Sequence, residues 1–467
     1  MSILNGSVKD DVMVGTDRAD EIFGFEGNDT IYGGKGKDKL YGGGGNDTLS
    51  GDDDEDELYG GEGNDTLDGG NGADKLFGGN GNDIYYIKDN ADFIQDESGL
   101  DTAYVSANFV KIPGNIENVI YTDGAQALPY WIDALVANNA FQSFLGNAKT
   151  LYYAFPTVIP SYISNLDDAN GWTPFTAIQK SRTKEALELI ASFFNLNFVE
   201  TKITDALNTI VFASNDQSYS SGYATLPSTN SSGSDVFLSA DDINKTLDDG
   251  SYGAWVLMHE LGHALGLKNV FSNSTGTSSS EFPPYLSGSE DSTAWSYMSY
   301  KLSSDQYAFN YSPFDIAALQ YIYGPSTKTR TGDDSYVISQ GSANFIWDGG
   351  GTDKVSAASS SKAVTIYLEP GYWGYVGSAK EAYISKAGQI TVNFGTQIEN
   401  LDGSSLGDGL YGNGLANAIN GNDGNDSITG NGGNDTLDGG AGQDTVVYAL
   451  NASSYAVSAV TGGFKIA

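Results

Sequence analysis

The sequence predicts a protein of several domains, in which a mixed α/β domain lies between two parallel β-rolls. Three observations support this fold class. Nine-residue repeats rich in glycine and aspartate occur near both ends, the region between them is rich in aromatic and apolar residues, and that region contains a helical motif with both histidines of the chain. With 467 residues, the chain is also too long for one ordinary domain.

The N-terminal repeats run without a slip from residue 15 to residue 86, in eight units of nine residues. Aspartate takes the sixth place of every unit: Asp20, Asp29, Asp38, Asp47, Asp56, Asp65, Asp74 and Asp83. An apolar residue or tyrosine takes the eighth place: Ile22, Ile31, Leu40, Leu49, Leu58, Leu67, Leu76 and Tyr85. A flexible linker does not keep such a register, so the pattern predicts an ordered repeat structure.

The pattern returns in five units over residues 403–447, where the sixth places are Asp408, Asn417, Asp426, Asp435 and Asp444. Glycines permit tight turns with positive φ, and the eighth residue of each short strand points inward. Stacked turns then form a parallel β-roll in which aspartates of neighbouring turns face each other. Ca²⁺ takes roughly six to eight oxygen ligands and suits such a cage.

These units resemble the RTX nonapeptide repeat, which implies that the sixth-place aspartates bind several Ca²⁺ ions. We expect weaker or missing calcium sites at Asn417 and in the unit at 51–59, which keeps its aspartate and leucine but loses the glycines of the turn.

The formal net charge of −37 argues against nucleic acids and anionic membranes as partners and favours cations. The chain has no cysteine, so disulfides cannot stabilise it. No run of eighteen apolar residues predicts a transmembrane helix. The segment 1–6 has neither the basic nor the apolar region of a Sec signal peptide.

The region between the repeats has its own pattern. Apolar residues at helical spacing over 183–194 predict an amphipathic helix, and 209–213 is typical of a strand. We therefore expect an N-terminal roll over 1–90, a β-rich flanking segment over 91–128, a central domain over 129–325, a β-rich connection over 326–402, and a second roll with a terminal strand over 403–467.

His259 and His263 lie four residues apart on a predicted helix for which Ser251 is a candidate N-cap. This spacing puts both imidazoles on one face, so both can reach one metal ion at ~2.0–2.1 Å. Glu260 is then the candidate general base that activates a metal-bound water. A pair of surface histidines is the simpler interpretation, but the apolar helix sequence around them argues against it.

Other segments extend the pattern into a family resemblance. Met298 and Tyr300 follow the histidines by about thirty residues. Together the matching segments resemble the serralysin family of metzincin endopeptidases over residues 129–447; they are 151–156, 221–224, the histidine helix, 295–300 and 315–324. The resemblance implies an α+β metzincin-like domain with one Zn²⁺ ion, a methionine turn at Met298, and Tyr300 as zinc ligand or oxyanion stabiliser.

Asn269 stands where the family has its third zinc histidine. Three alternatives follow from the change. Asn269 ligates zinc weakly, with Tyr300 and water completing the shell; a carboxylate of Glu281, Glu290 or Asp291 replaces it; or the domain holds little metal and is a pseudoprotease. The family also carries a short propeptide where this chain has a roll.

The resemblance implies a secreted, calcium-stabilised zinc endopeptidase that hydrolyses peptide bonds and leaves a Gram-negative bacterium through a type I secretion apparatus. We expect a monomer with a protein or peptide substrate, no nucleic-acid partner and no membrane insertion. The alternative is a non-catalytic, calcium-dependent extracellular surface or adhesion protein. The strand predicted at 463–467 indicates either a piece of a longer protein or an atypical export signal.

Overall fold

The computed structural model describes residues 2–137, 149–163, 166–206, 208–218, 220–227, 234–271, 283–303, 307–448, 457–460 and 463–466. The chain divides into two compact units: residues 1–138 with 271–286, and residues 139–270 with 287–467. Among the described residues, no helix is both long enough and apolar enough to cross a membrane.

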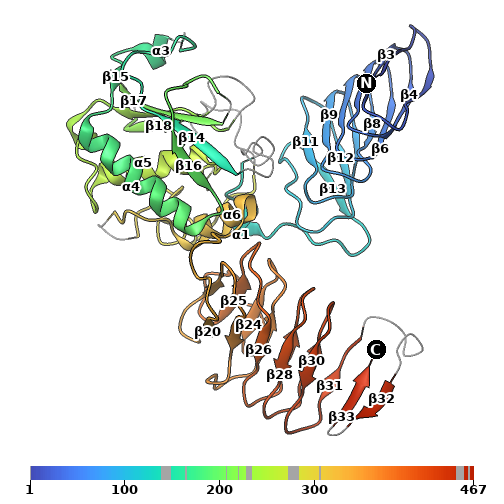
Figure 1. Ribbon diagram of the computed structural model, residues 1–467, viewed down its shortest axis with the longest axis vertical. Helices are drawn as coiled ribbons and strands as arrows, with labels where there is room; N and C mark the ends of the chain where they lie inside the picture. Colours follow the sequence, from blue (N-terminus) through green and yellow to red (C-terminus); the bar gives the residue numbers. More distant parts are fainter. Residues whose placement is uncertain are drawn as a thin grey trace. The chain divides into compact units, whose positions relative to one another are not determined.

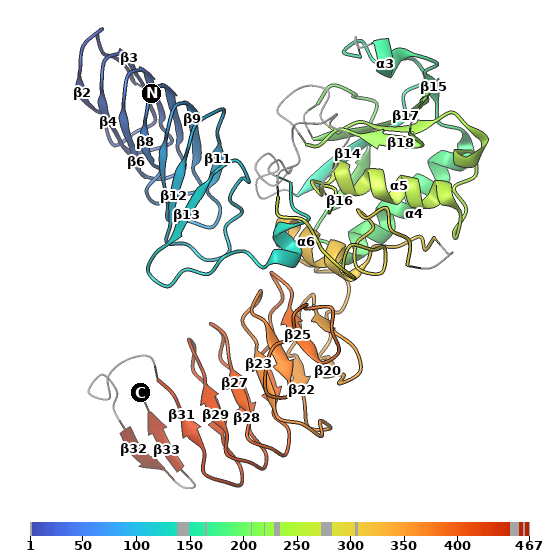
Figure 2. The same cartoon turned by 180° about the vertical axis from the view of Figure 1, so that it is seen from behind.

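The first unit is a parallel β-roll, in which successive strands of the repeats alternate between two sheets (Figures 1 and 2). One sheet has the order β1-β3-β5-β7-β9-β11, with β1 (Ser2–Asn5), β3 (Asp20–Glu26), β5 (Lys39–Gly44), β7 (Glu57–Glu62), β9 (Lys75–Asn80) and β11 (Phe93–Gln95). The other has the order β13-β12-β10-β8-β6-β4-β2, with β2 (Val12–Val14), β4 (Thr30–Lys35), β6 (Thr48–Asp53), β8 (Thr66–Asp68), β10 (Ile84–Ile87), β12 (Thr102–Val105) and β13 (Asn118–Tyr121).

The nine-residue period explains this arrangement. Two units make one full turn, so Ile22 pairs with Leu40 in one sheet and Ile31 pairs with Leu49 in the other. All eighth-place side chains from Ile22 to Tyr85 are fully buried and form one column between the sheets. The predicted β-roll is thus confirmed. Strands β11, β12 and β13 carry the same two sheets beyond the last repeat.

The second unit begins with a mostly parallel sheet in the order β16-β14-β17-β19-β18, with β15 beside β17. Its strands are β14 (Thr150–Ala154), β15 (Thr173–Pro174), β16 (Asn197–Glu200), β17 (Thr209–Asn215), β18 (Gly222–Ala224) and β19 (Val236–Ser239). Every residue of β17 is buried, so the strand predicted at 209–213 is the centre of the sheet. Strand β18 is antiparallel to β19 and forms one edge.

Helices α4 (Ala177–Phe193) and α5 (Tyr252–Ala264) lie along the same face of this sheet (Figure 1). The other helices of the described residues are α1 (Tyr130–Asp133), in the first unit, α3 (Leu166–Ala169), the 3-10 helix η2 (Asp242–Asn244) and α6 (Pro313–Tyr323). The helix predicted at 183–194 is present but starts earlier. Thr176 and Gln179 form a capping box that moves its first turn to Ala177.

The rest of the second unit also carries two sheets. One is β20-β22-β26-β28-β30, with β20 (Ser335–Val337), β22 (Lys354–Ser356), β26 (Asn400–Asp402), β28 (Ala418–Asn420) and β30 (Thr436–Asp438). The other is β21-β25-β24-β23-β27-β29-β31, with β21 (Asn344–Ile346), β23 (Val364–Tyr367), β24 (Gly374–Val376), β25 (Gln389–Val392), β27 (Gly409–Tyr411), β29 (Ser427–Thr429) and β31 (Thr445–Val446). A last antiparallel pair comprises β32 (Val457–Val460) and β33 (Gly463–Ile466).

The second repeat array stacks in the same way as the first. Leu410 pairs with Ile428 and Ile419 pairs with Leu437, in parallel strands of opposite sheets. The core thins toward the end, because Ile428 is fully buried whereas Val446 is 38% exposed. The few helices and the two rolls together agree with the predicted α+β class.

Candidate active site and cation sites

Helix α5 carries both histidines, and its two ends are fixed by local sequence. The Ser251 side chain accepts a hydrogen bond from the backbone N–H of Ala254, which confirms Ser251 as the N-cap. At the other end Gly266 has a φ of 102°, and the N–H of Leu267 donates to the carbonyl of Gly262. This is a Schellman motif, which needs glycine because an L side chain is strained in this conformation.

The two imidazoles are oriented by their Nδ1 atoms. His259 Nδ1 lies 2.8 Å from the carbonyl oxygen of Tyr297, and His263 Nδ1 lies 2.8 Å from the carbonyl oxygen of Leu267. A carbonyl can only accept, so Nδ1 is the protonated nitrogen in both rings and Nε2 keeps its lone pair. The ring centroids are 4.8 Å apart. Backbone carbonyls commonly orient metal-binding histidines in this way.

Burial suits these side chains to metal binding and proton transfer. Desolvation, with the nearby His263 ring, lowers the pKa of His259 to about 3, so this imidazole is neutral at physiological pH. Desolvation raises the pKa of Glu260 to about 8, against a smaller opposing effect of a hydrogen bond from the backbone of Ala224. A carboxyl group with a pKa near the working pH can both take up and release a proton.

A turn beneath α5 supports His259. The side chain of Met298 is fully buried, and a Cβ on Gly262 would come within 2.6 Å of its sulfur. Only glycine at position 262 therefore lets the helix approach the methionine this closely. Met298 lies under the histidine helix, as the resemblance implies.

Asp315 holds this turn in place, a role that no sequence motif indicated. Its Oδ1 accepts from the Ser296 hydroxyl at 2.7 Å, and its Oδ2 accepts from the backbone N–H of Tyr297 at 2.8 Å and of Ser312 at 3.0 Å. The carbonyl of Tyr297 in turn accepts from His259. A capping-box pattern at Ser312 was the available signal, but it indicated only a helix start.

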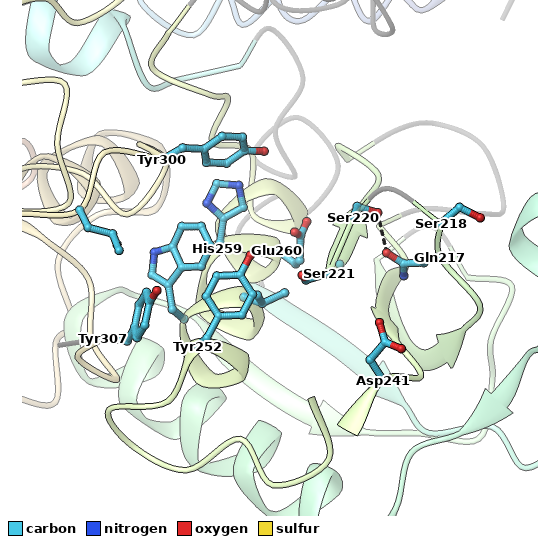
Figure 3. A pocket seen from close by; sticks show the side chains of 14 residues that line it. Gln217, Ser218, Ser220, Ser221, Asp241, Tyr252, His259, Glu260, Tyr300 and Tyr307 are labelled. Carbon is cyan, nitrogen blue, oxygen red and sulfur yellow. Dashed lines mark hydrogen bonds between the residues drawn. The ribbon is translucent and has the colours of Figure 1, made fainter. Parts of the chain in front are cut away.

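A pocket of about 560 Å³ opens beside these residues (Figure 3). His259, Glu260, Tyr300 and Gly222 of the edge strand β18 contribute to its lining. The Tyr300 ring, which is 57% exposed, lies over His259 with 5.4 Å between the ring centroids. The structure therefore brings the predicted His259, Glu260 and Tyr300 together at one open pocket.

The residues considered for a third ligand differ in their surroundings. Asn269 is buried, with 7% exposure, and lies just after the turn that ends α5. The Glu290 carboxylate accepts from the backbone N–H of Ser385, while Asp291 pairs with Lys301 and accepts from Ser299. Glu281 lies outside the described residues. Glu290 and Asp291 are thus engaged in other interactions.

The sixth-place aspartates form a regular ladder along the first roll. The backbone N–H of each donates to Oδ1 of the aspartate eighteen residues later, as from Asp38 to Asp56 at 2.7 Å. The second carboxylate oxygen, Oδ2, is buried and has no hydrogen-bond partner in the aspartates Asp29, Asp38, Asp47, Asp56, Asp65, Asp74 and Asp83. A row of buried carboxylates in this state requires a cation or a proton at each.

The donor atoms around each Oδ2 fit Ca²⁺. A Cβ built on Gly42 would meet Oδ2 of Asp47 at 2.3 Å and the carbonyl oxygen of Gly60 at 2.8 Å. A carboxylate oxygen and a carbonyl oxygen therefore converge on the space that the glycine leaves open. Hard cations such as Ca²⁺ prefer oxygen ligands of these kinds. Asp426 and the carbonyl of Gly439 converge in the same way at Gly421 of the second roll.

The two nine-residue repeats in which we expect weaker or missing calcium sites differ from each other. In 51–59, Asp52 and Asp54 adopt the positive φ values of the lost glycines, and Asp56 keeps a buried, unpartnered Oδ2. The Asn417 amide nitrogen instead donates to the carbonyls of Ile398 and Glu399. This amide group is satisfied within the protein, which is compatible with the weaker or missing calcium site expected there. The same expectation for 51–59 has no such support.

Comparison with known proteins finds matches both for the repeats and for a longer part of the chain. The family profile of the RTX calcium-binding nonapeptide repeat matches overlapping stretches over residues 5–94 and again over 411–446. Serralysin B of Dickeya chrysanthemi is 32% identical over 292 residues, which cover 56% of this chain and 58% of that protein. Metallopeptidase AprA of Pseudomonas marginalis is 30% identical over 301 residues, covering 58% and 61%. Serralysin of Proteus mirabilis is 30% identical over 290 residues, covering 53% and 57%.

The rolls and their matched repeats define an RTX calcium-binding protein. Over more than half of its length, the chain is similar to metalloproteases of the serralysin family. The matched part spans about three fifths of the relatives, 58% of serralysin B and 61% of AprA.

Proposed function

We propose that the second unit is a zinc endopeptidase of metzincin type. The observation that carries this proposal is the pair of Nδ1–carbonyl hydrogen bonds, because they select the tautomer in which Nε2 of His259 and of His263 carries the lone pair that a metal ion needs. Asn269 is the proposed third ligand, through its amide oxygen. Zinc bound by these residues would acidify a water molecule and polarise the scissile carbonyl of the substrate.

Glu260 is the proposed general base. It lines the pocket next to His259, and its raised pKa lets it accept the proton of the attacking water and pass it to the leaving amine. The hydroxyl of Tyr300 would donate a hydrogen bond to the carbonyl oxygen of the substrate as negative charge develops there. The exposed position of Tyr300 allows its side chain to move toward the substrate.

The substrate is proposed to be an extended peptide. In the described residues β18 pairs with β19 alone, so one side of this short strand can add another strand beside the pocket. A backbone-to-backbone interaction of this kind holds a chain in place without demanding one particular side chain. Such binding fits an enzyme that acts on proteins.

The rolls are proposed to fold only when Ca²⁺ is present. In cytoplasm, where free Ca²⁺ is low, the buried aspartates would repel each other and keep the repeats unfolded, which suits export by a type I apparatus. Extracellular Ca²⁺ would then neutralise and order them. We accordingly place the protein outside a Gram-negative cell.

Casein hydrolysis by the purified full chain with Ca²⁺ and Zn²⁺ tests the catalytic proposal. Glu260→Ala should lower kcat/KM by roughly 10²–10⁴-fold, because the proton acceptor is lost. Glu188→Ala, an exposed carboxylate on α4, is the matched control and should have no effect. Wild-type protein that binds one zinc ion per chain but shows no more activity than Glu260→Ala would contradict the proposal.

Asn269 stands where the family has its third zinc histidine. This difference favours one other function, a calcium-dependent surface or adhesion protein with an inactive protease domain. Asn269→His separates the two, since imidazole is a stronger zinc ligand than an amide oxygen. A weakly active enzyme should gain zinc affinity and activity together. A zinc-free wild-type protein that becomes active only as Asn269→His would instead identify a pseudoprotease.

A further inference from the structure

Three aromatic rings form one wall of the pocket beside the two histidines (Figure 3). The ring centroids of Tyr252 and Trp255 on α5 are 5.4 Å apart, and the centroid of Tyr307 lies 5.5 Å from that of Tyr252 and 6.0 Å from that of Trp255. Trp255 is buried, whereas Tyr252 and Tyr307 are half-buried. The wall therefore offers an extended apolar surface along the N-terminal half of the helix.

The other side of the pocket is polar and includes Asp241. In Figure 3, Ser220 and Asp241 lie on the opposite side of the view from Tyr252 and Tyr307. Asp241 is exposed, and its Oδ2 accepts a hydrogen bond from the Ser239 hydroxyl at 2.7 Å. This hydrogen bond holds the carboxylate in place while leaving it open to solvent.

The charged side chains at the pocket are acidic. Among its described lining residues, Asp241 and Glu260 are acidic and none is lysine or arginine. The single lysine of the segment 240–250, Lys245, pairs with Asp242. No salt bridge within the described ranges engages Asp241. A cationic group of a ligand would therefore match the charge of the pocket.

A peptide paired with β18 would pass over α5. A Cβ on Gly222 of β18 would lie 2.6 Å from the Val256 side chain and 3.0 Å from that of Glu260, so the edge strand packs directly against the helix. Successive side chains of an extended peptide point to opposite faces, so every second one turns toward α5.

The length of the wall limits which side chains can follow it. Tyr252 lies seven residues before His259 on the same helix, which corresponds to about 10 Å along the helix axis. A short side chain near the proposed zinc ion covers only a part of this distance. A long side chain is needed to use both the aromatic wall and the carboxylate.

We propose that this pocket is a specificity subsite for lysine or arginine in the protein substrate, and that Asp241 binds the positive charge. The inference rests on the endopeptidase function proposed above. Lysine and arginine join a long apolar stem to a charged tip, and a cation within about 6 Å of an aromatic ring centroid is attracted to the ring. Phenylalanine or leucine would fill the aromatic side but leave the carboxylate of Asp241 unmatched.

Cleavage of a mixed peptide library by the full chain with Ca²⁺ and Zn²⁺, analysed by mass spectrometry, tests the subsite. The wild type should cut with lysine or arginine enriched at one fixed position relative to the cleaved bond. Asp241→Asn should lower kcat/KM for such peptides on the order of tenfold relative to peptides with a neutral residue there, because a hydrogen bond between charged groups is lost. Asp241→Lys should reverse the preference toward aspartate or glutamate. Asp248→Asn removes the same charge from an exposed residue that does not line the pocket, and this control should cut as the wild type does.

A binding measurement separates this inference from the catalytic proposal. In a Glu260→Ala background, calorimetry compares a peptide that contains arginine with one that contains citrulline, which has nearly the same shape but no charge. The arginine stands at the position found by cleavage, or at each position in turn if nothing is cleaved. The arginine peptide should bind on the order of tenfold more tightly, and Asp241→Asn should abolish the difference. Charge-selective binding by a protein that cleaves no peptide would support the subsite and contradict the endopeptidase function.

Equal discrimination between arginine and citrulline in the Asp241→Asn and Asp248→Asn variants would overturn the proposal. Failure of every arginine peptide to bind would contradict it as well. Tighter binding of a phenylalanine peptide than of the arginine peptide would instead identify the pocket as an apolar subsite.

Discussion

At the scale of single residues, Asp315 acts on the proposed active site without touching it. It accepts hydrogen bonds from Ser296 and from the backbone N–H groups of Tyr297 and Ser312, and Tyr297 then orients His259 through its carbonyl. Burial raises the pKa of Asp315 to about 7, which those three hydrogen bonds oppose. A buried carboxyl group is retained here because it fixes the turn from which His259 takes its orientation.

Asp315→Ala should weaken zinc binding by roughly 10–100-fold, the usual effect of losing a partner that orients a metal ligand. Two buried N–H groups would lose their acceptor, at about 1–3 kcal/mol each, so the thermal midpoint of the second unit should fall as well. Competition with a zinc chelator measures the affinity. Asp242→Ala, at an exposed aspartate of η2, is the control, and zinc affinity equal to that control would show that the turn holds without Asp315.

At the scale of the element, α5 shows how a helix end becomes part of a metal site. The Schellman turn at Gly266 brings the carbonyl of Leu267 back to within 2.8 Å of His263 Nδ1. The same turn directs the chain toward Asn269. The conformation of one glycine therefore determines the tautomer of one proposed ligand and the position of another.

Gly266→Ala should cost about 1–2 kcal/mol of stability, because alanine is strained at this positive φ. It should also lower zinc affinity, since the carbonyl of Leu267 would shift away from His263. Gly124→Ala is a matched control: Gly124 also has a positive φ of 79°, and a Cβ there meets nothing within 4 Å. Thermal melting and chelator competition on both variants give the comparison. A Gly266→Ala protein with unchanged zinc affinity would disprove the link between the turn and the site.

At the scale of the whole molecule, the two rolls bury many negatively charged aspartates, whose repulsion bound cations would neutralise. The chain carries 60 acidic residues against 23 lysines and arginines. Burial, with smaller effects of neighbouring carboxylates, raises the pKa of Asp38 to about 6, of Asp65 to about 7 and of Asp56 to about 8. Charging these groups without a counter-ion therefore opposes folding of the rolls.

Removal of Ca²⁺ with a chelator at neutral pH should abolish most of the β-sheet signal in circular dichroism, and added Ca²⁺ should restore it. The helical signal of the central domain should persist in part, since its core is built from apolar side chains of β17, α4 and α5. Mg²⁺ at equal concentration is the control, because its small, rigid octahedral shell does not suit these turns. A β-sheet signal indifferent to the chelator would refute calcium-dependent folding.

Local periodicity in the sequence was enough to predict the rolls and the shared helix face of the two histidines. The nine-residue register predicts the rolls, their buried column from Ile22 to Tyr85 and their aspartate ladder, because each depends only on a short, repeated contact. The spacing of His259 and His263 similarly predicts one shared helix face. The cap at Ser251 could be found for the same reason.

Only the tertiary structure placed residues that are distant in sequence. Asp315 lies more than fifty residues from His259, Asp96 meets Asp83 through the stacking of strands, and β18 lies beside Glu260 through sheet order. A sequence pattern records spacing along the chain, whereas these contacts arise from packing between elements. The interactions of Glu290 with Ser385 and of Asp291 with Lys301 likewise appear only in the tertiary structure, because each joins residues that the sequence pattern does not connect.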